Sequence, residues 1–192
     1  MKKLIYGVGL NDSKEPVTSL INGKRVISKY YDLWNSMIQR CYSEKEKEKW
    51  PTYKDCYVCD DWLIFSNFKS WMKKQEWHGL HLDKDLLFKG NKVYSPETCI
   101  FVSKELNAFT TDSVAKRGIY PIGVNFHKSS GKFIAQCKNP FTKSRGYIGL
   151  YSSPEDAHEA WRKRKHELAC QWADAVDDPR LKKALRERYA HS

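Results

Sequence analysis

Four of the six cysteines carry the first chemistry that the sequence offers. Cys56 and Cys59 form a C-x-x-C pair, the spacing at which two thiolates can bind one tetrahedral metal ion. Cys41 before the pair and Cys99 after it would complete the ligands of a structural Zn²⁺. Because the spacing to these two cysteines is irregular and aromatic residues surround them, an ordinary core role is the alternative interpretation. Two histidines are possible substitute ligands or surface residues: His78 and His81.

Residues 81–107, HLDKDLLFKGNKVYSPETCIFVSKELN, carry a second pattern. This stretch resembles the HNH nuclease motif, in which two strands and a helix present a metal ion to the scissile phosphate. The resemblance places Asp83 and Asn107 at metal-ligand positions for a catalytic Mg²⁺ or another divalent cation. It places Gly90-Asn91-Lys92 at the turn of the motif.

Two positions depart from the HNH pattern. Lys84 stands in place of the general-base histidine, and Thr98 in place of the asparagine that orients it. To activate water, the lysine pKa would have to fall from about 10.4 to near neutrality, and the carboxylates of Asp83 and Asp85 act against that fall. Lys84 could instead contact phosphate, or His81 could serve as the base. The candidate catalytic set is thus Asp83, Lys84, Thr98 and Asn107, and whether the chain is an enzyme stays open.

A long stretch without acidic residues carries the third pattern. Between Asp112 and Glu155 the sequence has no aspartate or glutamate, but it has seven positive charges: Lys116, Arg117, Lys128, Lys132, Lys138, Lys143 and Arg145. A surface that binds phosphates must exclude carboxylates, because these repel the nucleic-acid backbone. The alternative is a sheet with a merely solvated polar face.

Alternation along residues 132–138 agrees with a binding face. Phe133, Ala135 and Cys137 would point towards a helix, while Lys132, Gln136 and Lys138 would share the opposite face with Ile134.

Residues 119–172 resemble the AP2 DNA-binding domain in the segments GVNFHKSSGKFIAQCK, GYIGLY and SSPEDAHEAW. In that family a three-stranded sheet enters the major groove and a helix packs behind it. The resemblance implies base and phosphate contacts from six positions: Asn125, His127, Gln136, Lys138, Arg145 and Tyr147. Lys128, Lys132 and Lys143 join this predicted DNA-binding set as neighbouring cations.

Three of these positions differ from the plant AP2 proteins. Asn125 and His127 stand where the plant proteins carry arginines, and Gln136 replaces an acidic residue. The base preference of the plant proteins therefore does not transfer. Amide side chains can still pair with adenine, and Arg145 with guanine, so sequence readout remains chemically available.

Local signals predict the elements that position these residues. Asn22-Gly23 indicates a tight hairpin turn within residues 18–28. Helical periodicity covers residues 30–42 and 60–74, and a helix follows Ser103 through Phe109. Strands are expected over 80–87 and 96–102 around a Gly90-Asn91 turn, and then over 122–126, 132–138 and 145–150 as a meander. Cap sequences at 152–156 and 178–179 begin a long helix and a basic C-terminal helix.

These elements predict an α+β fold with two modules. The N-terminal module, residues 1–110, is expected to be zinc-ribbon-like or of the ββα-metal (HNH-like) type, with an N-terminal hairpin. A linker over 111–118 leads to an AP2-like domain over 119–176, a three-stranded antiparallel sheet packed on a long helix, and then to a basic helix over 177–192.

Composition sets the expected partners and location. The 34 lysines and arginines against 23 acidic residues give a net charge of +11, which favours polyanionic partners. No apolar run approaches the about 18 residues of a membrane span, and the N-terminal apolar stretch is too short for a signal peptide. We therefore expect a cytoplasmic protein, in the host cytoplasm if it is phage-encoded, that binds double-stranded DNA but no membrane and no small-molecule cofactor.

Together the two modules resemble the phage-encoded HNH homing endonucleases that carry an AP2-type DNA-binding domain. This resemblance implies metal-dependent hydrolysis of DNA phosphodiester bonds, with the basic sheet selecting the site. Because of Lys84 and Thr98, a catalytically degenerate DNA-binding or host-interfering protein is the alternative hypothesis. A third is an interaction module directed at a host protein.

Overall fold

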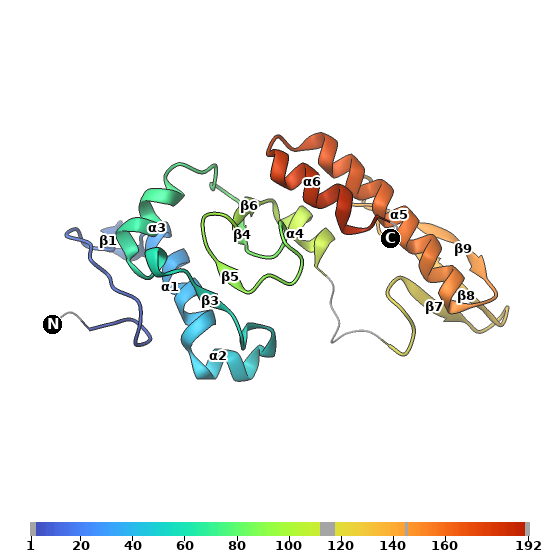
Figure 1. Ribbon diagram of the computed structural model, residues 1–192, viewed down its shortest axis with the longest axis horizontal. Helices are drawn as coiled ribbons and strands as arrows, with labels where there is room; N and C mark the ends of the chain where they lie inside the picture. Colours follow the sequence, from blue (N-terminus) through green and yellow to red (C-terminus); the bar gives the residue numbers. More distant parts are fainter. Residues whose placement is uncertain (1–2, 112–117, 145, 191–192) are drawn as a thin grey trace. The chain divides into compact units, whose positions relative to one another are not determined.

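The computed structural model describes residues 3–111, 118–144 and 146–190, and it has a mixed α+β fold with small sheets (Figure 1). The chain forms two compact units, residues 1–103 and residues 104–192. None of the helices in the described ranges is long and apolar enough to cross a membrane.

The first unit begins with the predicted hairpin. Strands β1 (Thr18–Ile21) and β2 (Lys24–Ile27) pair antiparallel, and Asn22 and Gly23 both have positive φ angles, as a type I′ turn requires. Helix α1 (Lys29–Tyr42) follows and confirms the helix expected over residues 30–42. Its apolar side chains recur at helical spacing, and one side of the helix is therefore buried.

The following segment is only partly as expected. The charged run forms a short helix, α2 (Glu44–Lys49), and a 3₁₀ turn, η1 (Pro51–Tyr53), follows it. The single helix expected over 60–74 is wrong: a 3₁₀ turn, η2 (Asp60–Leu63), and helix α3 (Phe65–Met72) divide that stretch. Ile64 breaks the helix because its extended backbone forms a parallel bridge with Leu10.

Two small sheets complete the first unit. Strand β4 (His81–Asp83) pairs antiparallel with β6 (Ile100–Val102), which confirms both strands in shortened form. The Gly90-Asn91 turn expected between them is present, with Gly90 at φ +81° and a 3.0 Å hydrogen bond from the Asn91 N–H to the Phe88 carbonyl, but it does not join the two strands directly. Residues 84–99 form a long connection that carries β5 (Val93–Tyr94), and β5 pairs in parallel with β3 (Tyr57–Val58).

An aromatic core holds the first unit together. Its largest fully buried side chains include Trp34, Trp62, Phe65 and Phe68. The Trp34 indole N–H donates a 2.7 Å hydrogen bond to the Trp62 carbonyl, so this buried donor has a partner inside the core. Trp62 meets Phe68 edge to face with 5.1 Å between ring centroids.

The second unit contains the predicted meander. Strands β7 (Val124–His127), β8 (Lys132–Gln136) and β9 (Tyr147–Tyr151) form one antiparallel sheet in the order β7-β8-β9. The β8–β9 pairing is irregular between Ala135 and Gln136. Gly123, which precedes the sheet, has φ +82°, and a Cβ there would lie 2.0 Å from the Trp161 ring.

Two helices with strong caps follow the sheet, as predicted. Helix α5 (Pro154–Ala175) begins where the Ser153 hydroxyl accepts a hydrogen bond from the Asp156 backbone N–H. Helix α6 (Pro179–Arg188) begins at Asp178, whose carboxylate accepts from two backbone N–H groups. The first turns of α5 pack on the sheet through Ala157 and Ala160, and Leu168 and Ala169 further along the helix are also fully buried.

Helix α4 (Lys104–Thr110) joins the second unit, whereas the expected module boundary placed it in the first. The Lys165 ammonium donates a 2.6 Å hydrogen bond to the Phe109 carbonyl, and Arg188 donates at 2.9 Å to the Thr110 carbonyl. The Phe109 ring also meets Tyr189 of the C-terminal segment edge to face. The boundary between the compact units thus lies between residues 103 and 104. Residues 112–117 of the expected linker lie outside the described residues.

Candidate nucleic-acid interface and polar loop

The face of the β7-β8-β9 sheet that points away from α5 is the candidate interface. Strand register places residues of this face in rows across the sheet: Asn125 beside Ile134 and Leu150, His127 beside Lys132, and Gln136 beside Tyr147. Asn125, His127, Lys132, Gln136 and Tyr147 are exposed. The structure thus brings five of the predicted DNA-binding residues onto one face.

The opposite face explains why these side chains are free. Val124 and Ala135 pair across the sheet and are buried against α5, together with Ala157 of that helix. Because side chains alternate along a strand, burying this set forces the polar set outwards. The predicted orientation of the middle strand is therefore confirmed for Ala135 and Gln136.

The cations around the face carry uncompensated charge. Among the described residues, Lys128, Lys132, Lys138 and Lys143 are exposed and make no ion pair. Lys128 lies in the β7–β8 turn, while Lys138 and Lys143 lie in the β8–β9 connection. The predicted contact Arg145 lies outside the described residues.

This arrangement can both hold and read a duplex. Lysines without ion pairs can replace the counterions of a phosphate backbone, while exposed amides such as Asn125 and Gln136 can pair with adenine edges. Ile134 and Leu150 add apolar surface between the polar rows. Sequence reasoning did not single out Leu150, although its place beside Ile134 follows from the alternation of β9.

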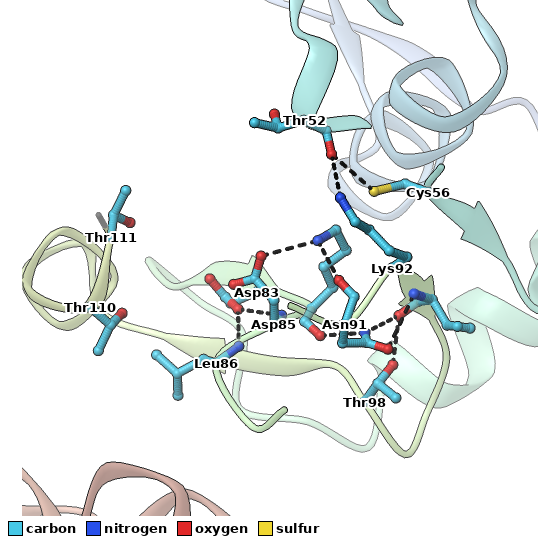
Figure 2. Close-up of polar contacts among 12 residues, drawn as sticks. Thr52, Cys56, Asp83, Asp85, Leu86, Asn91, Lys92, Thr98, Thr110 and Thr111 are labelled. Atoms are coloured by element: carbon cyan, nitrogen blue, oxygen red, sulfur yellow. Dashed lines mark hydrogen bonds and ion pairs between the residues drawn. The ribbon is translucent and has the colours of Figure 1, made fainter. Parts of the chain in front are cut away.

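Three of the four residues predicted to be catalytic lie at the end of β4 or in the connection from β4 to β6, where polar contacts hold them (Figure 2): Asp83, Lys84 and Thr98. The Asp83 carboxylate accepts hydrogen bonds from the backbone N–H groups of Asp85 and Leu86, at 2.8 and 2.7 Å. The Lys84 ammonium donates to the Asp85 carboxylate at 3.1 Å and to the Asn91 carbonyl at 2.9 Å.

Asn91 and Thr98 close the same loop. The Asn91 amide donates to the carbonyls of Lys84 and Val93, at 2.6 and 2.7 Å, and the Thr98 hydroxyl also donates to the Val93 carbonyl (Figure 2). Ser95 lies 3.2 Å from the Thr98 hydroxyl. These side chains satisfy the backbone of a long connection that otherwise has little regular structure.

The charges in this loop favour a structural lysine. Burial alone would lower the pKa of Lys84, but the Asp85 carboxylate and its hydrogen bond, together with Cys56 and Asp83, outweigh burial and raise the pKa above its ordinary value. Burial and the Asp85 charge raise the pKa of Asp83, against the two backbone donors. Lys84 therefore stays charged at neutral pH and cannot accept a proton from water.

The predicted divalent-metal pair divides between the two units. Asp83 lies on β4 in the first unit, and Asn107 lies on α4 in the second. Within the described ranges no group of three or more His, Cys, Asp or Glu side chains could hold a metal ion. The Mg²⁺ site at Asp83 and Asn107 stays a prediction.

The four candidate zinc ligands lie in or beside the core of the first unit. Cys41, Cys56 and Cys99 are buried, and Cys59 is half-buried. Burial raises the pKa of Cys41 and Cys99 to about 12, and it also raises the pKa of Cys56 and Cys59. A zinc ion would itself deprotonate the thiols that bind it, so these raised pKa values describe the protein without metal. The zinc site stays a prediction that elemental analysis of the purified protein tests.

Comparison with known proteins gives one partial likeness. The chain is 44% identical over 48 residues to the ethylene-responsive transcription factor ERF116 of Arabidopsis thaliana. The match covers 25% of this chain and 16% of the plant protein, so the chain spans only a small part of that relative. No family model matches the chain, and no solved structure matches it. The likeness supports an AP2-type domain, while nothing in the comparisons supports an HNH nuclease.

Proposed function

We propose that the chain binds double-stranded DNA through the outer face of the β7-β8-β9 sheet. The observation that carries this proposal is the juxtaposition on one face of exposed amides with lysines that have no ion pair. The similarity to a plant transcription factor supports it, as does the absence of acidic residues from 113 to 154.

The binding should combine phosphate attraction with contacts to base edges. Lys128 and Lys132 contribute to affinity for any sequence, and each phosphate contact steepens the salt dependence. Gln136 and Tyr147 lie side by side in the register, where the amide can pair with a base and the ring can contact one. Selectivity should therefore depend more on Gln136 than on the lysines.

Fluorescence anisotropy with duplex oligonucleotides, after selection from a randomised pool, tests the proposal. Lys132→Gln should weaken binding to all duplexes alike and reduce the slope of log K against log salt by about 0.9. Gln136→Ala should instead flatten base preference at one position, by about 1–3 kcal/mol of discrimination.

The matched control is Lys45→Gln, which removes an exposed lysine of α2 in the first unit and should leave binding unchanged. If Lys45→Gln and Lys132→Gln weaken binding equally, net charge alone drives association and the sheet is not the binding site.

For the first unit, we propose a scaffold role without DNA hydrolysis, because Lys84 is a satisfied, charged structural residue. The alternative is metal-dependent cleavage of DNA at the Asp83 loop. Incubating the full chain with plasmid and linear DNA in Mg²⁺, Mn²⁺ or Zn²⁺ should leave the DNA intact. Cleavage that disappears in Asp83→Ala would establish the nuclease and overturn the scaffold proposal.

A further inference from the structure

The second unit contains a pocket that no sequence motif indicates. Its volume is about 490 Å³, within the range of about 300–1,000 Å³ typical of small-molecule sites. Residues from α4, α5 and the β8–β9 connection line it, as does Ile122, which precedes β7. All of these lining residues belong to the same compact unit.

The charged lining is strongly basic. Lys104, Lys138, Lys143 and Lys165 line the pocket with a single acidic residue, Glu105. The first three lysines are exposed and make no ion pair among the described residues, so their ammonium groups are available to an anion. An anionic ligand of small size therefore fits the electrostatics of the pocket.

The remaining wall is apolar and held in place. Phe109 and Trp161 line the pocket and are otherwise buried. The Lys165 ammonium lies 3.7 Å from the centre of the Phe109 ring and bonds to the Phe109 carbonyl, which fixes α4 against α5. The pocket is thus built before a ligand arrives, and little entropy is lost in forming it.

We propose that this pocket binds a nucleotide. A planar base can lie against the apolar wall of Phe109, Trp161 and Ile122, while the phosphate meets the exposed lysines. The Glu105 carboxylate can accept a hydrogen bond from an exocyclic amine of the base. Amine-bearing bases should therefore bind better than thymine.

The nucleotide has two possible sources with the same chemistry. It is either a free nucleotide or an unpaired nucleotide at the end of a DNA strand. Cys137 and Lys138, the two residues that follow β8, both line the pocket, so the pocket lies beside the sheet proposed to bind DNA. Only the second source rests on the proposed DNA binding.

Calorimetric titration of the full chain with dAMP, dCMP, dGMP and dTMP, and with inorganic phosphate, tests the first source. Ala108→Trp places a bulky uncharged group at an exposed lining position and should weaken nucleotide binding roughly tenfold or more. The double variant Lys104→Gln with Lys143→Gln should also weaken it roughly tenfold.

Two variants serve as matched controls outside the pocket and should leave nucleotide binding unchanged: Ala175→Trp at an exposed position of α5, and Lys163→Gln on the same helix. Circular dichroism melting of each variant separates loss of binding from loss of folding.

A duplex with one unpaired 2-aminopurine at its end tests the second source, against the blunt duplex. A fluorescence change that Ala108→Trp removes, with blunt-duplex affinity unchanged, would assign the pocket to a DNA-borne nucleotide. The proposal is overturned if neither source binds, or if phosphate alone binds as tightly and Ala108→Trp has no effect. The blunt-duplex affinity is measured separately, so failure of the pocket is distinguishable from failure of the sheet.

Discussion

The two units use their polar and reactive side chains in opposite ways. In the first unit, hydrogen bonds to the unit's own backbone engage three polar side chains of the 84–98 connection: Lys84, Asn91 and Thr98. Three cysteines of this unit are buried. In the second unit, the amides and lysines on and beside the outer sheet face are exposed, and the lysines have no ion pair among the described residues. Polar and reactive side chains thus form internal contacts in the first unit, whereas in the second unit they are exposed and can bind a partner.

The comparison predicts that damage to either unit has separable consequences. Trp34 is fully buried and donates to the Trp62 carbonyl, so Trp34→Ala should cost the first unit about 3–5 kcal/mol. Calorimetric melting should show one transition lowered, while duplex affinity stays within about twofold. Loss of DNA binding in this variant, with the second transition intact, would place the binding site in the first unit.

Gly123→Ala should destabilise the second unit and leave the first unit unchanged. Alanine at φ +82° is strained, and its Cβ would meet the Trp161 ring, which is itself buried. We expect the second unit to lose about 2–4 kcal/mol, with DNA binding falling in step and the first transition unchanged.

Gly131→Ala is the matched control, because Gly131 also has a positive φ angle but an added Cβ there has no neighbour within 4 Å. The stability losses of the two variants should therefore differ only by the cost of the steric clash with Trp161. Equal destabilisation would show that backbone strain, and not the Trp161 contact, decides the effect.

The sequence predicted those elements whose signals are local. The Asn22-Gly23 turn, the Ser153 and Asp178 caps and the alternation of β8 each act within a few residues, and each is found in the structure. The candidate interface followed from the same alternation, although Arg145 lies outside the described residues.

What the sequence could not predict depends on distant partners. The parallel pairing of Tyr57–Val58 with Val93–Tyr94 joins segments far apart in the chain, so no local pattern announces it. Helix α4 was assigned to the first module by its neighbours in sequence, but Lys165 and Arg188 hold it in the second unit. A resemblance to a motif rests on residue types at given positions, whereas the role of each residue depends on its hydrogen-bond partners in the folded chain.

Lys84 sharpens the contrast between a structural and a catalytic residue. Lys84→Ala leaves the Asn91 carbonyl without its donor, and we expect the first unit to lose about 1–3 kcal/mol in urea denaturation at neutral pH, without a change in duplex affinity. Because the folded pKa of Lys84 is raised, its stabilisation is complete below the ordinary lysine pKa of about 10.4 and is lost as the pH rises through the folded value. The difference from wild type should therefore narrow above about pH 10.5.

Lys89→Ala, an exposed lysine in the same connection, is the matched control and should change stability by less than about 0.5 kcal/mol. A stability loss that is equal in the two variants, or independent of alkaline pH, would contradict the structural role of Lys84.

The smallest expected effect concerns the cap of α6 in the second unit. The hydrogen bond from the Arg180 side chain, with two backbone donors, lowers the pKa of Asp178. A lowered folded pKa gives stability that is present above the ordinary value of about 3.9 and is lost as the pH falls through the folded value. Asp178→Ala should lower the free energy of unfolding by about 1 kcal/mol at pH 7. Asp178→Asn keeps the helix cap but removes the stability that depends on ionisation of the carboxylate. Thermal melting of the second unit between pH 7 and pH 3 checks both, and an asparagine variant that loses stability in acid as steeply as wild type would show that other carboxylates carry the dependence.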